Sequence, residues 1–373
     1  RQTDRQTVNI RNSNIELLKI FAIFLIIIFH FNQTLTATGN NSLGYLINIE
    51  EYAKTRPYTA YILAVFQRFG ELGNNIFFVC SAFFLVDIKK SYWKKMFSLI
   101  SDVWLVSVIF LCIILFVGTV AIDGEIILKC LFPTTFANNW YITSYVCFLA
   151  VFPFLNLIIS SLSKKRHLIA IAFLFFIDFS SGSSSMFKNW FFVYFLIAYI
   201  KKYLIFIAES KTKNIVLLIF ALGLLIFSKL YVIVGIRFST ILKYFDKAIH
   251  KTNIIYVLFA ISSFNLFSKI KIKSRIINRI SKQSFLIYII HENILIRRYY
   301  RPIVWTYVYE NIGYEHIVGL IIILAVLTFM GSLALSLIYE KTLGRLSKRI
   351  SEKIYPRIES IGIKVTDRLI KIR

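Results

Sequence analysis

Three side chains in the first apolar stretch of the sequence could take part in chemistry: Glu16, Lys19 and His30. The stretch, ELLKIFAIFLIIIFHF, is apolar enough to enter a bilayer, where ionisable groups are costly and usually functional. At about 100° and 1.5 Å per residue, Lys19 and His30 share one helix face and lie roughly 16 Å apart along it. An imidazole can take a proton from a hydroxyl, and an ammonium can hold a phosphate. The alternative is structural, with Lys19 snorkelling to the headgroups and His30 capping the helix at the opposite interface.

A second imidazole, His291, lies in the apolar stretch SFLIYIIHE. Counted from Lys282, it is roughly 13 Å into its helix, a depth comparable to that of His30, so both imidazoles could border one cavity. The alternative is a hydrogen bond between packed helices. The neighbouring Glu292 is expected to face another direction, outside the site.

Other chemistries are not indicated by the sequence. Cys80, Cys112 and Cys147 fall inside apolar stretches and Cys130 in a loop, without the spacing of a disulfide framework or a zinc site. Glycine-rich phosphate loops, HExxH motifs and inverted repeats are not found. We therefore expect no metal and no permanently bound cofactor.

The composition predicts an all-α, polytopic membrane bundle without a separate soluble domain. Hydrophobic residues make up 57% of the 373 residues, and 36 are Phe, too apolar for a soluble surface. The first apolar run lacks a small-residue cleavage site, so we expect it to remain as a helix. About ten runs can cross a bilayer: 15–31, 72–87, 98–120, 140–160, 167–180, 189–206, 214–234, 252–268, 283–297 and 315–339.

The basic residues predict the topology. Placing the N-terminus, alternate loops and the C-terminal segment on one side gathers 31 of the 44 lysines and arginines there, Lys19 near the start of the first span included, which indicates that both termini are cytoplasmic. The net charge of +25 then reflects topology and attraction to anionic lipid, and no nucleic acid is expected as a partner. Residues 1–340 form the predicted transmembrane domain, and 341–373 a basic amphipathic tail on the cytoplasmic membrane surface.

Four stretches resemble the acyltransferase-3 family of bacterial membrane O-acyltransferases. The first, IELLKIFAIFLIIIFHF (15–31), keeps the family's spacing between a basic residue and His, with Lys19 where Arg is usual. FGELGNNIFFVCSAFFLVD (69–87) is similar to FGxxGVxxFFxxSGFxL, with Asn74 and Ala82 as departures. NNWYITSYVCFLAVFPFLN (138–156) and SKQSFLIYIIHEN (281–293) resemble the third and fourth elements. Together they extend over nearly the whole membrane region.

The resemblance implies transfer of an acyl group, usually acetyl, from acyl-coenzyme A to a hydroxyl of an envelope glycan. His30 would be the base or acyl-relay residue, and Lys19, with Glu16 one turn below, would help to hold the donor. The compact ammonium of Lys19 replaces the planar guanidinium of the usual arginine, which changes how phosphate is bound. Lys94 and Lys95 stand at the first basic position of a cytoplasmic Arg-x-x-x-Arg pattern, with Ser98 at the second, and would bind the donor's phosphates.

On the acceptor side, the resemblance covers Trp140 and Tyr145, whose rings could receive a sugar. Ser81 and Asn75 are expected near the cavity as hydrogen-bonding residues rather than nucleophiles. The expected partners are acyl-CoA, an envelope glycan or lipid-linked oligosaccharide, and the bilayer, in the cytoplasmic membrane of a bacterium. A glycan transporter or flippase without acyl transfer, and a glycan polymerase, are the alternatives.

Overall fold

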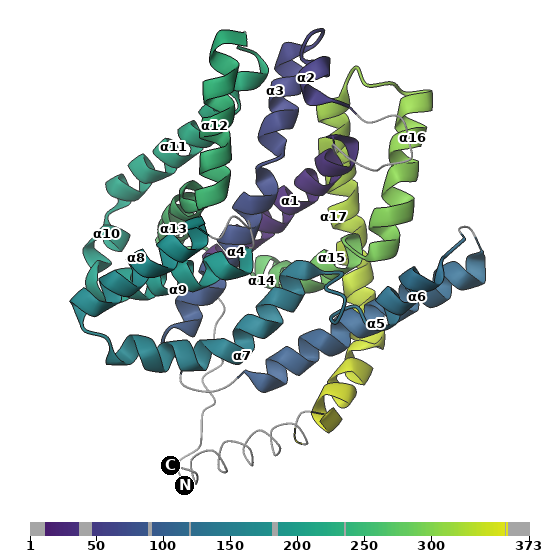
Figure 1. The fold of residues 1–373 in the computed structure, drawn as a ribbon. Coiled ribbons are helices and arrows are strands. Elements are labelled where there is room, and N and C mark those ends of the chain that lie inside the picture. Colours follow the sequence, from purple (N-terminus) through teal and green to yellow (C-terminus); the bar gives the residue numbers. More distant parts are fainter. Residues whose placement is uncertain are drawn as a thin grey trace.

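A computed structural model describes residues 12–36, 47–88, 92–118, 121–180, 186–234, 236–354 and 356. Every regular element in these ranges is helical, so the all-α prediction is confirmed (Figure 1). The helices before the middle of the chain are α1 (Ser13–Thr36), α2 (Ile49–Tyr52), α3 (Pro57–Phe66), α4 (Phe69–Leu85), α5 (Trp93–Val117), α6 (Gly124–Leu131), α7 (Trp140–Ser161) and α8 (Lys164–Ser180). Those that follow are α9 (Met186–Tyr203), α10 (Ile205–Glu209), α11 (Lys211–Ser228), η1 (Leu230–Val232), α12 (Ile236–Thr252), α13 (Ile254–Phe267), α14 (Arg275–Lys282), α15 (Ser284–His291), η2 (Ile296–Tyr300), α16 (Arg301–Asn311) and α17 (Ile317–Thr342).

Five helical segments in the described ranges are long and apolar enough to cross a membrane, by length and composition. They are Ser13–Thr36, Trp93–Val117, Trp140–Ser161, Lys211–Val232 and Ile317–Thr342. The other predicted spans also contain helices, but α4, α8 and α13 are shorter than 18 residues. Two helices, α12 and α16, were not predicted as spans because their charged and polar residues exclude a continuous apolar run.

The prediction of one span over 283–297 is wrong in its extent. Helix α15 ends at His291, and a turn containing Asn293 leads into the π-helical turn η2 and then α16. The Asn293 side chain accepts a hydrogen bond from the backbone N–H of Leu295, which offers the chain an alternative to continued helix. The break turns the backbone at the residues that follow His291.

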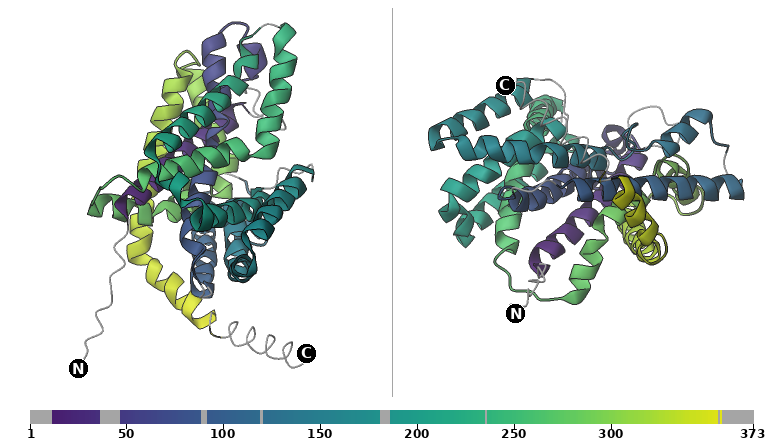
Figure 2. Two further views of the ribbon diagram at one scale, coloured as in Figure 1. Left: turned by 90° about the vertical axis from the view of Figure 1, so that its left-hand side faces the viewer. Right: turned by 90° about the horizontal axis from the view of Figure 1, so that it is seen from below.

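Helix α1 lies at the centre of the bundle. It is the most buried of the five long segments, and it packs against α4, α13, α14 and α17. The helices from α8 to α12 lie on one side of it, whereas α5, α16 and α17 lie on the other (Figure 1). Turned views show the same division, with α5 and α6 extending from the body (Figure 2). The central helix therefore carries Lys19 and His30 through the interior.

The close packing of α1 and α4 depends on two glycines of α4. A Cβ atom at Gly73 would lie 2.6 Å from the carbonyl oxygen of Ala22 and 2.6 Å from a side-chain carbon of Ile26. At Gly70 it would meet the ring of Phe29 at 2.6 Å. Small residues at such positions let helix backbones approach, and packing then holds the helices together in lipid.

Gly73→Ala is expected to lower the free energy of unfolding by about 1–3 kcal/mol, because α1 would have to move away from α4. Gly223→Ala in α11 is the matched control, since no atom lies within 4 Å of its added Cβ and alanine favours the helix. Thermal unfolding of both variants in lipid nanodiscs measures the difference. Equal melting temperatures for the two variants would contradict the close approach.

Candidate active site

The centre of the candidate site is a buried group of four side chains from α1, the end of α15, the residue after it, and α16. His30 Nδ1 lies 3.2 Å from His291 Nε2 and 3.2 Å from Glu292 Oε1. Arg301 donates to Glu292 Oε1 at 2.6 Å and to the carbonyl oxygen of His291 at 2.8 Å. All four residues are at least 93% buried. We call them the His30 cluster.

The hydrogen bonds of the His30 cluster determine where its protons lie. His291 Nδ1 is 2.8 Å from the carbonyl oxygen of Ile287, which can only accept, so this nitrogen carries the proton of a neutral ring. His291 Nε2 then has the lone pair. Because His30 Nδ1 faces that lone pair and the Glu292 carboxylate, it must donate, which leaves His30 Nε2 as the free base. A carboxylate that holds an imidazole in this tautomer also stabilises the imidazolium formed when the base takes a proton.

The expectation that Glu292 faces away from the site is wrong. It assumed a continuous helix, in which neighbouring residues point about 100° apart. Glu292 instead follows the last residue of α15, where the backbone leaves the helix, and its carboxylate returns to His30. Arg301 was not identified from the sequence at all, because Arg297 and Arg298 lie between it and Glu292 and the sequence does not distinguish which arginine is buried.

His30, His291 and Glu292 are also the described residues that could hold a metal ion, since one ligand atom of each lies within 4.8 Å of the others. The surrounding charges do not favour this. Arg301 and Arg297 contact the two carboxylate oxygens, at 2.6 and 3.5 Å, so Glu292 is already neutralised by guanidinium groups. The same charges suit a hydrogen-bonded base better than a cation site.

A cavity of about 590 Å³ borders the cluster. His30 and its neighbours on α1, with Glu292 and Arg297, line one part of it, and α4, α7, α8, α9, α12 and Asn253 between α12 and α13 contribute the rest. We call it the His30 cavity. Trp140 lies in its lining and is 37% exposed, so a ring face or edge remains accessible.

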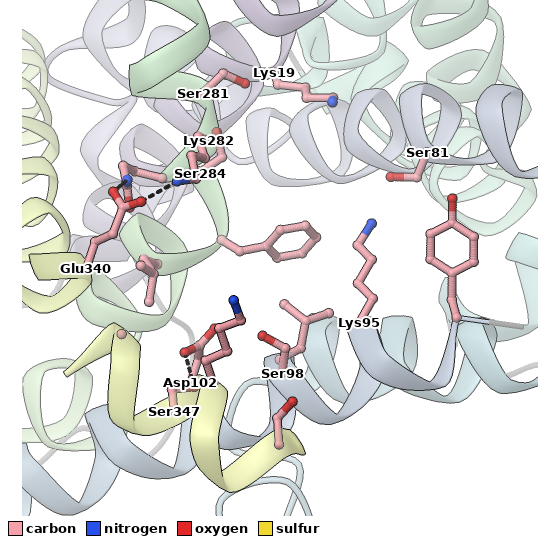
Figure 3. A pocket seen from close by; sticks show the side chains of 18 of the residues that line it. Lys19, Ser81, Lys95, Ser98, Asp102, Ser281, Lys282, Ser284, Glu340 and Ser347 are labelled. Carbon is pink, nitrogen blue, oxygen red and sulfur yellow. Dashed lines mark hydrogen bonds and ion pairs between the residues drawn. The ribbon is translucent and has the colours of Figure 1, made fainter. Parts of the chain in front are cut away.

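A second cavity, of about 990 Å³, surrounds the start of α1, and we call it the Lys19 cavity. It is lined by Lys19, Lys94, Lys95, Ser81 and further polar residues (Figure 3). Lys19 pairs with Glu16 at 3.2 Å, and Lys94 pairs with Glu352 at 3.3 Å. The structure thus brings the four residues predicted on the donor side to one cavity: Glu16, Lys19, Lys94 and Lys95.

The segment after α17 forms part of the Lys19 cavity. Residues 344–354 are helical, and Gly344, Ser347, Lys348 and Ser351 line the cavity. Ser347 Oγ and Tyr339 OH donate to Asp102 of α5, at 2.6 and 2.8 Å. This part of the predicted surface tail therefore packs against α5; most of 355–373 lies outside the described residues.

A layer of packed side chains separates the two cavities. Phe77 and Phe285 line the Lys19 cavity and also a small void with Tyr141 and Tyr288. Tyr288 in turn contacts the His291 ring, with centroids 5.6 Å apart. The layer is only a few side chains thick between the lysines and the His30 cluster.

One predicted acceptor-side residue, Tyr145, lies elsewhere than expected. Tyr145 is buried, stacks on Phe285 and accepts a hydrogen bond from Lys95 at 3.3 Å, so it belongs beside the Lys19 cavity rather than with Trp140. Tyr145 lies more than one helical turn after Trp140, which carries it away from the far end of α7. Asn75 is 1% exposed and bonds Asn253, which lines the His30 cavity, so it is a hydrogen-bonding residue near that cavity, as expected. Its neighbour Asn74 lines the cavity itself.

Comparison with known proteins identifies the family of this chain. A family model described as an acyltransferase domain matches residues 12–340. The chain belongs to the acyltransferase-3 family. No curated protein and no solved structure matches the chain.

The acyltransferase-3 match extends over the His30 cluster, the His30 cavity and the part of the Lys19 cavity that precedes residue 341. Together with its apolar helices, it makes the chain a multi-pass membrane acyltransferase. An acyltransferase needs a place for the activated acyl donor, a place for the acceptor and a group that takes the acceptor's proton. The residues around α1 can supply all three.

Proposed function

We propose that this acyltransferase transfers an acetyl group, or a closely related short acyl group, from acyl-CoA to a hydroxyl of an envelope polysaccharide or its lipid-linked precursor. The observation that carries the proposal is the position of His30. Its Nε2 is free to act as a base, and the His30 cluster lies between the Lys19 cavity and the His30 cavity. The donor's phosphates would bind in the Lys19 cavity. The acceptor would occupy the His30 cavity.

In the proposed reaction, His30 Nε2 takes the proton of the acceptor hydroxyl as the oxygen attacks the thioester carbonyl. The new carbon–oxygen bond forms while the carbon–sulfur bond breaks, and the coenzyme A thiolate leaves. Glu292 stabilises the imidazolium, which then returns its proton to the thiolate. Lys19 and His30 are roughly 16 Å apart along α1, a span that the extended arm of coenzyme A can bridge.

The topology follows from the same assignment. Acyl-CoA is a cytoplasmic metabolite, so the Lys19 cavity and the start of α1 would face the cytoplasm, with both chain ends on that side. The excess of basic residues there supports the orientation. The His30 cavity would then open toward the outer part of a bacterial cytoplasmic membrane.

The test uses the full chain in lipid nanodiscs with radiolabelled acetyl-CoA and de-O-acylated surface polysaccharide from the cell that makes the protein. Release of coenzyme A thiol that depends on the polysaccharide, together with alkali-labile label in the polysaccharide, is the expected result. Propionyl- and succinyl-CoA compare donors. Movement of glycan across the bilayer without ester formation would replace this proposal with a transporter.

Lys95→Met is expected to raise KM for acetyl-CoA at least tenfold, since a charge-assisted hydrogen bond to phosphate contributes roughly 1.5–3 kcal/mol. The ammonium of Lys95 projects into the Lys19 cavity, near Ser81 (Figure 3). Lys165→Met on α8 is the matched control, because Lys165 is exposed and does not line this cavity. An unchanged KM in Lys95→Met would remove this lysine from donor binding.

A further inference from the structure

A third cavity, of about 370 Å³, lies apart from both cavities of the candidate site. It is lined by residues of α4, α9, α10 and α13, and α10 lies at the edge of the bundle (Figure 1). None of its lining residues borders the Lys19 cavity or the His30 cavity. Ile205 of α10 belongs to the lining and is 58% exposed, so the cavity is open at this edge. We call it the α10 groove.

The lining of the α10 groove changes from apolar to polar along the chain direction. On α9 and α13 the earlier lining residues are apolar and the later ones are polar or basic, whereas both lining residues of α4 are apolar. The lining residues are Val79 and Phe83 of α4, Ile197, Ile200 and Lys201 of α9, Ile205, Ala208 and Glu209 of α10, and Ile261, Phe264, Asn265, Ser268 and Lys269 in α13 and the turn after it.

Two lysine contacts bring the polar ends of these helices together. Lys201 Nζ donates to the carbonyl oxygen of Phe83 at 2.9 Å and pairs with Asp87, which joins the end of α9 to the end of α4. Lys269 Nζ donates to the carbonyl oxygen of Glu209, which joins the turn after α13 to α10. We call the end of the groove at Lys201 and Lys269 its mouth. The groove is therefore apolar inside and basic at the mouth.

Positive charge is in excess around the mouth. Residues 201–213 contain four lysines and one glutamate, and residues 269–275 contain three lysines, one arginine and no acidic residue. Lys201 is already paired with Asp87. Lys269 is exposed, has no ion pair with a carboxylate in the described part of the chain, and uses one of its three N–H groups on a carbonyl oxygen. Its ammonium can therefore still bind an anion.

The apolar part of the groove by itself does not select a ligand from a membrane. Lipid tails are as apolar as the side chains that line it, so a tail gains only close packing by entering. The basic mouth adds selectivity, because lysines near the membrane surface attract anionic headgroups. In the orientation proposed above, α4, α9 and α13 all end on the cytoplasmic side, so the mouth would lie at the inner headgroups.

We propose that the α10 groove binds an anionic phospholipid, with one acyl chain against α4, α9 and α13 and the phosphate at Lys269. The bound lipid would join α10 to the rest of the bundle at a place where protein contacts leave a cavity. This site is separate from the acyl-transfer site, and it does not depend on the reaction proposed for His30.

The test is native mass spectrometry of the full chain in detergent with equimolar phosphatidylglycerol and phosphatidylcholine that carry the same acyl chains. We expect the first phosphatidylglycerol to bind at least tenfold more tightly than the first phosphatidylcholine. Glycerol 3-phosphate, which carries the charge without the tails, should compete poorly. Equal affinities for the two lipids, or full competition by glycerol 3-phosphate, would overturn the proposal.

One pair of variants tests the charge at the mouth. Lys269→Gln should lower the affinity for phosphatidylglycerol about fivefold, the effect expected of one lysine near an anionic headgroup, and leave phosphatidylcholine unchanged. Lys165→Gln is the matched control, because Lys165 is exposed on α8 and does not line the groove. Unchanged phosphatidylglycerol affinity in Lys269→Gln would refute the proposed position of the phosphate.

A second pair tests the groove without changing its charge. Ala208→Phe places a ring in the groove and should weaken phosphatidylglycerol binding at least tenfold. Ala172→Phe is the matched control, since Ala172 is exposed on α8 and lies outside the lining. The melting temperature of each variant shows whether it is folded. If Ala208→Phe does not fold, Ile261→Phe on α13 takes its place, and unchanged binding in the folded variant would exclude the groove as the lipid site.

Discussion

His30→Gln is expected to lower kcat for acyl transfer by about 10²–10⁴-fold, the contribution typical of a positioned general base. Glutamine is similar in size and polar, but its amide cannot take the proton of the acceptor hydroxyl. The substitution also removes the imidazolium that Glu292 would stabilise. KM for acetyl-CoA should change little, because Lys19 and Lys95 lie in the other cavity.

The measurement is ester formation in nanodiscs at saturating acetyl-CoA, with protein level and folding checked in parallel. His316→Gln is the matched control, since His316 is exposed where α17 begins. A His30→Gln protein that keeps normal turnover would exclude His30 as the base. His291 would then be the next imidazole to replace.

Arg301→Leu is expected to lower the free energy of unfolding by about 3–5 kcal/mol, because it leaves the buried Glu292 carboxylate without its main partner. Arg301 is 4% exposed and Glu292 is 4% exposed, so water cannot replace the lost hydrogen bond. The double variant Arg301→Leu with Glu292→Leu removes both charges. It should recover much of the lost stability, since the cost lies in an unpaired buried charge.

Thermal unfolding in nanodiscs measures this comparison, and acyl transfer separates stability from function. The double variant should remain impaired in transfer, because His30 has lost the carboxylate that holds its tautomer. Arg345→Leu, beyond α17, is the control for loss of an arginine at an exposed position. A single Arg301→Leu variant as stable as the wild type would show that the ion pair does not stabilise the fold.

The helical architecture could be predicted because it depends on local and compositional properties. Long apolar runs have only helices or closed barrels available to them in a bilayer, since every backbone hydrogen bond must be made within the protein. The spacing of Lys19 and His30 on one face follows in the same way from helical periodicity. Helix breaks at single polar residues, such as Asn293, are set by particular hydrogen bonds and were missed.

The sequence by itself determined the helical class, the family and the two ends of the site, because runs of apolar residues and motifs along the chain carry that information. Only the tertiary structure decided that His30, His291, Glu292 and Arg301 meet, since their contacts join α1 to a segment more than 260 residues away and depend on the turn after α15. The tertiary structure also placed Tyr145 beside Lys95. It placed Asn74 in the lining of the His30 cavity. Neighbours in space are selected by packing and by the need to pair buried polar groups, and neither can be read from the order of residues.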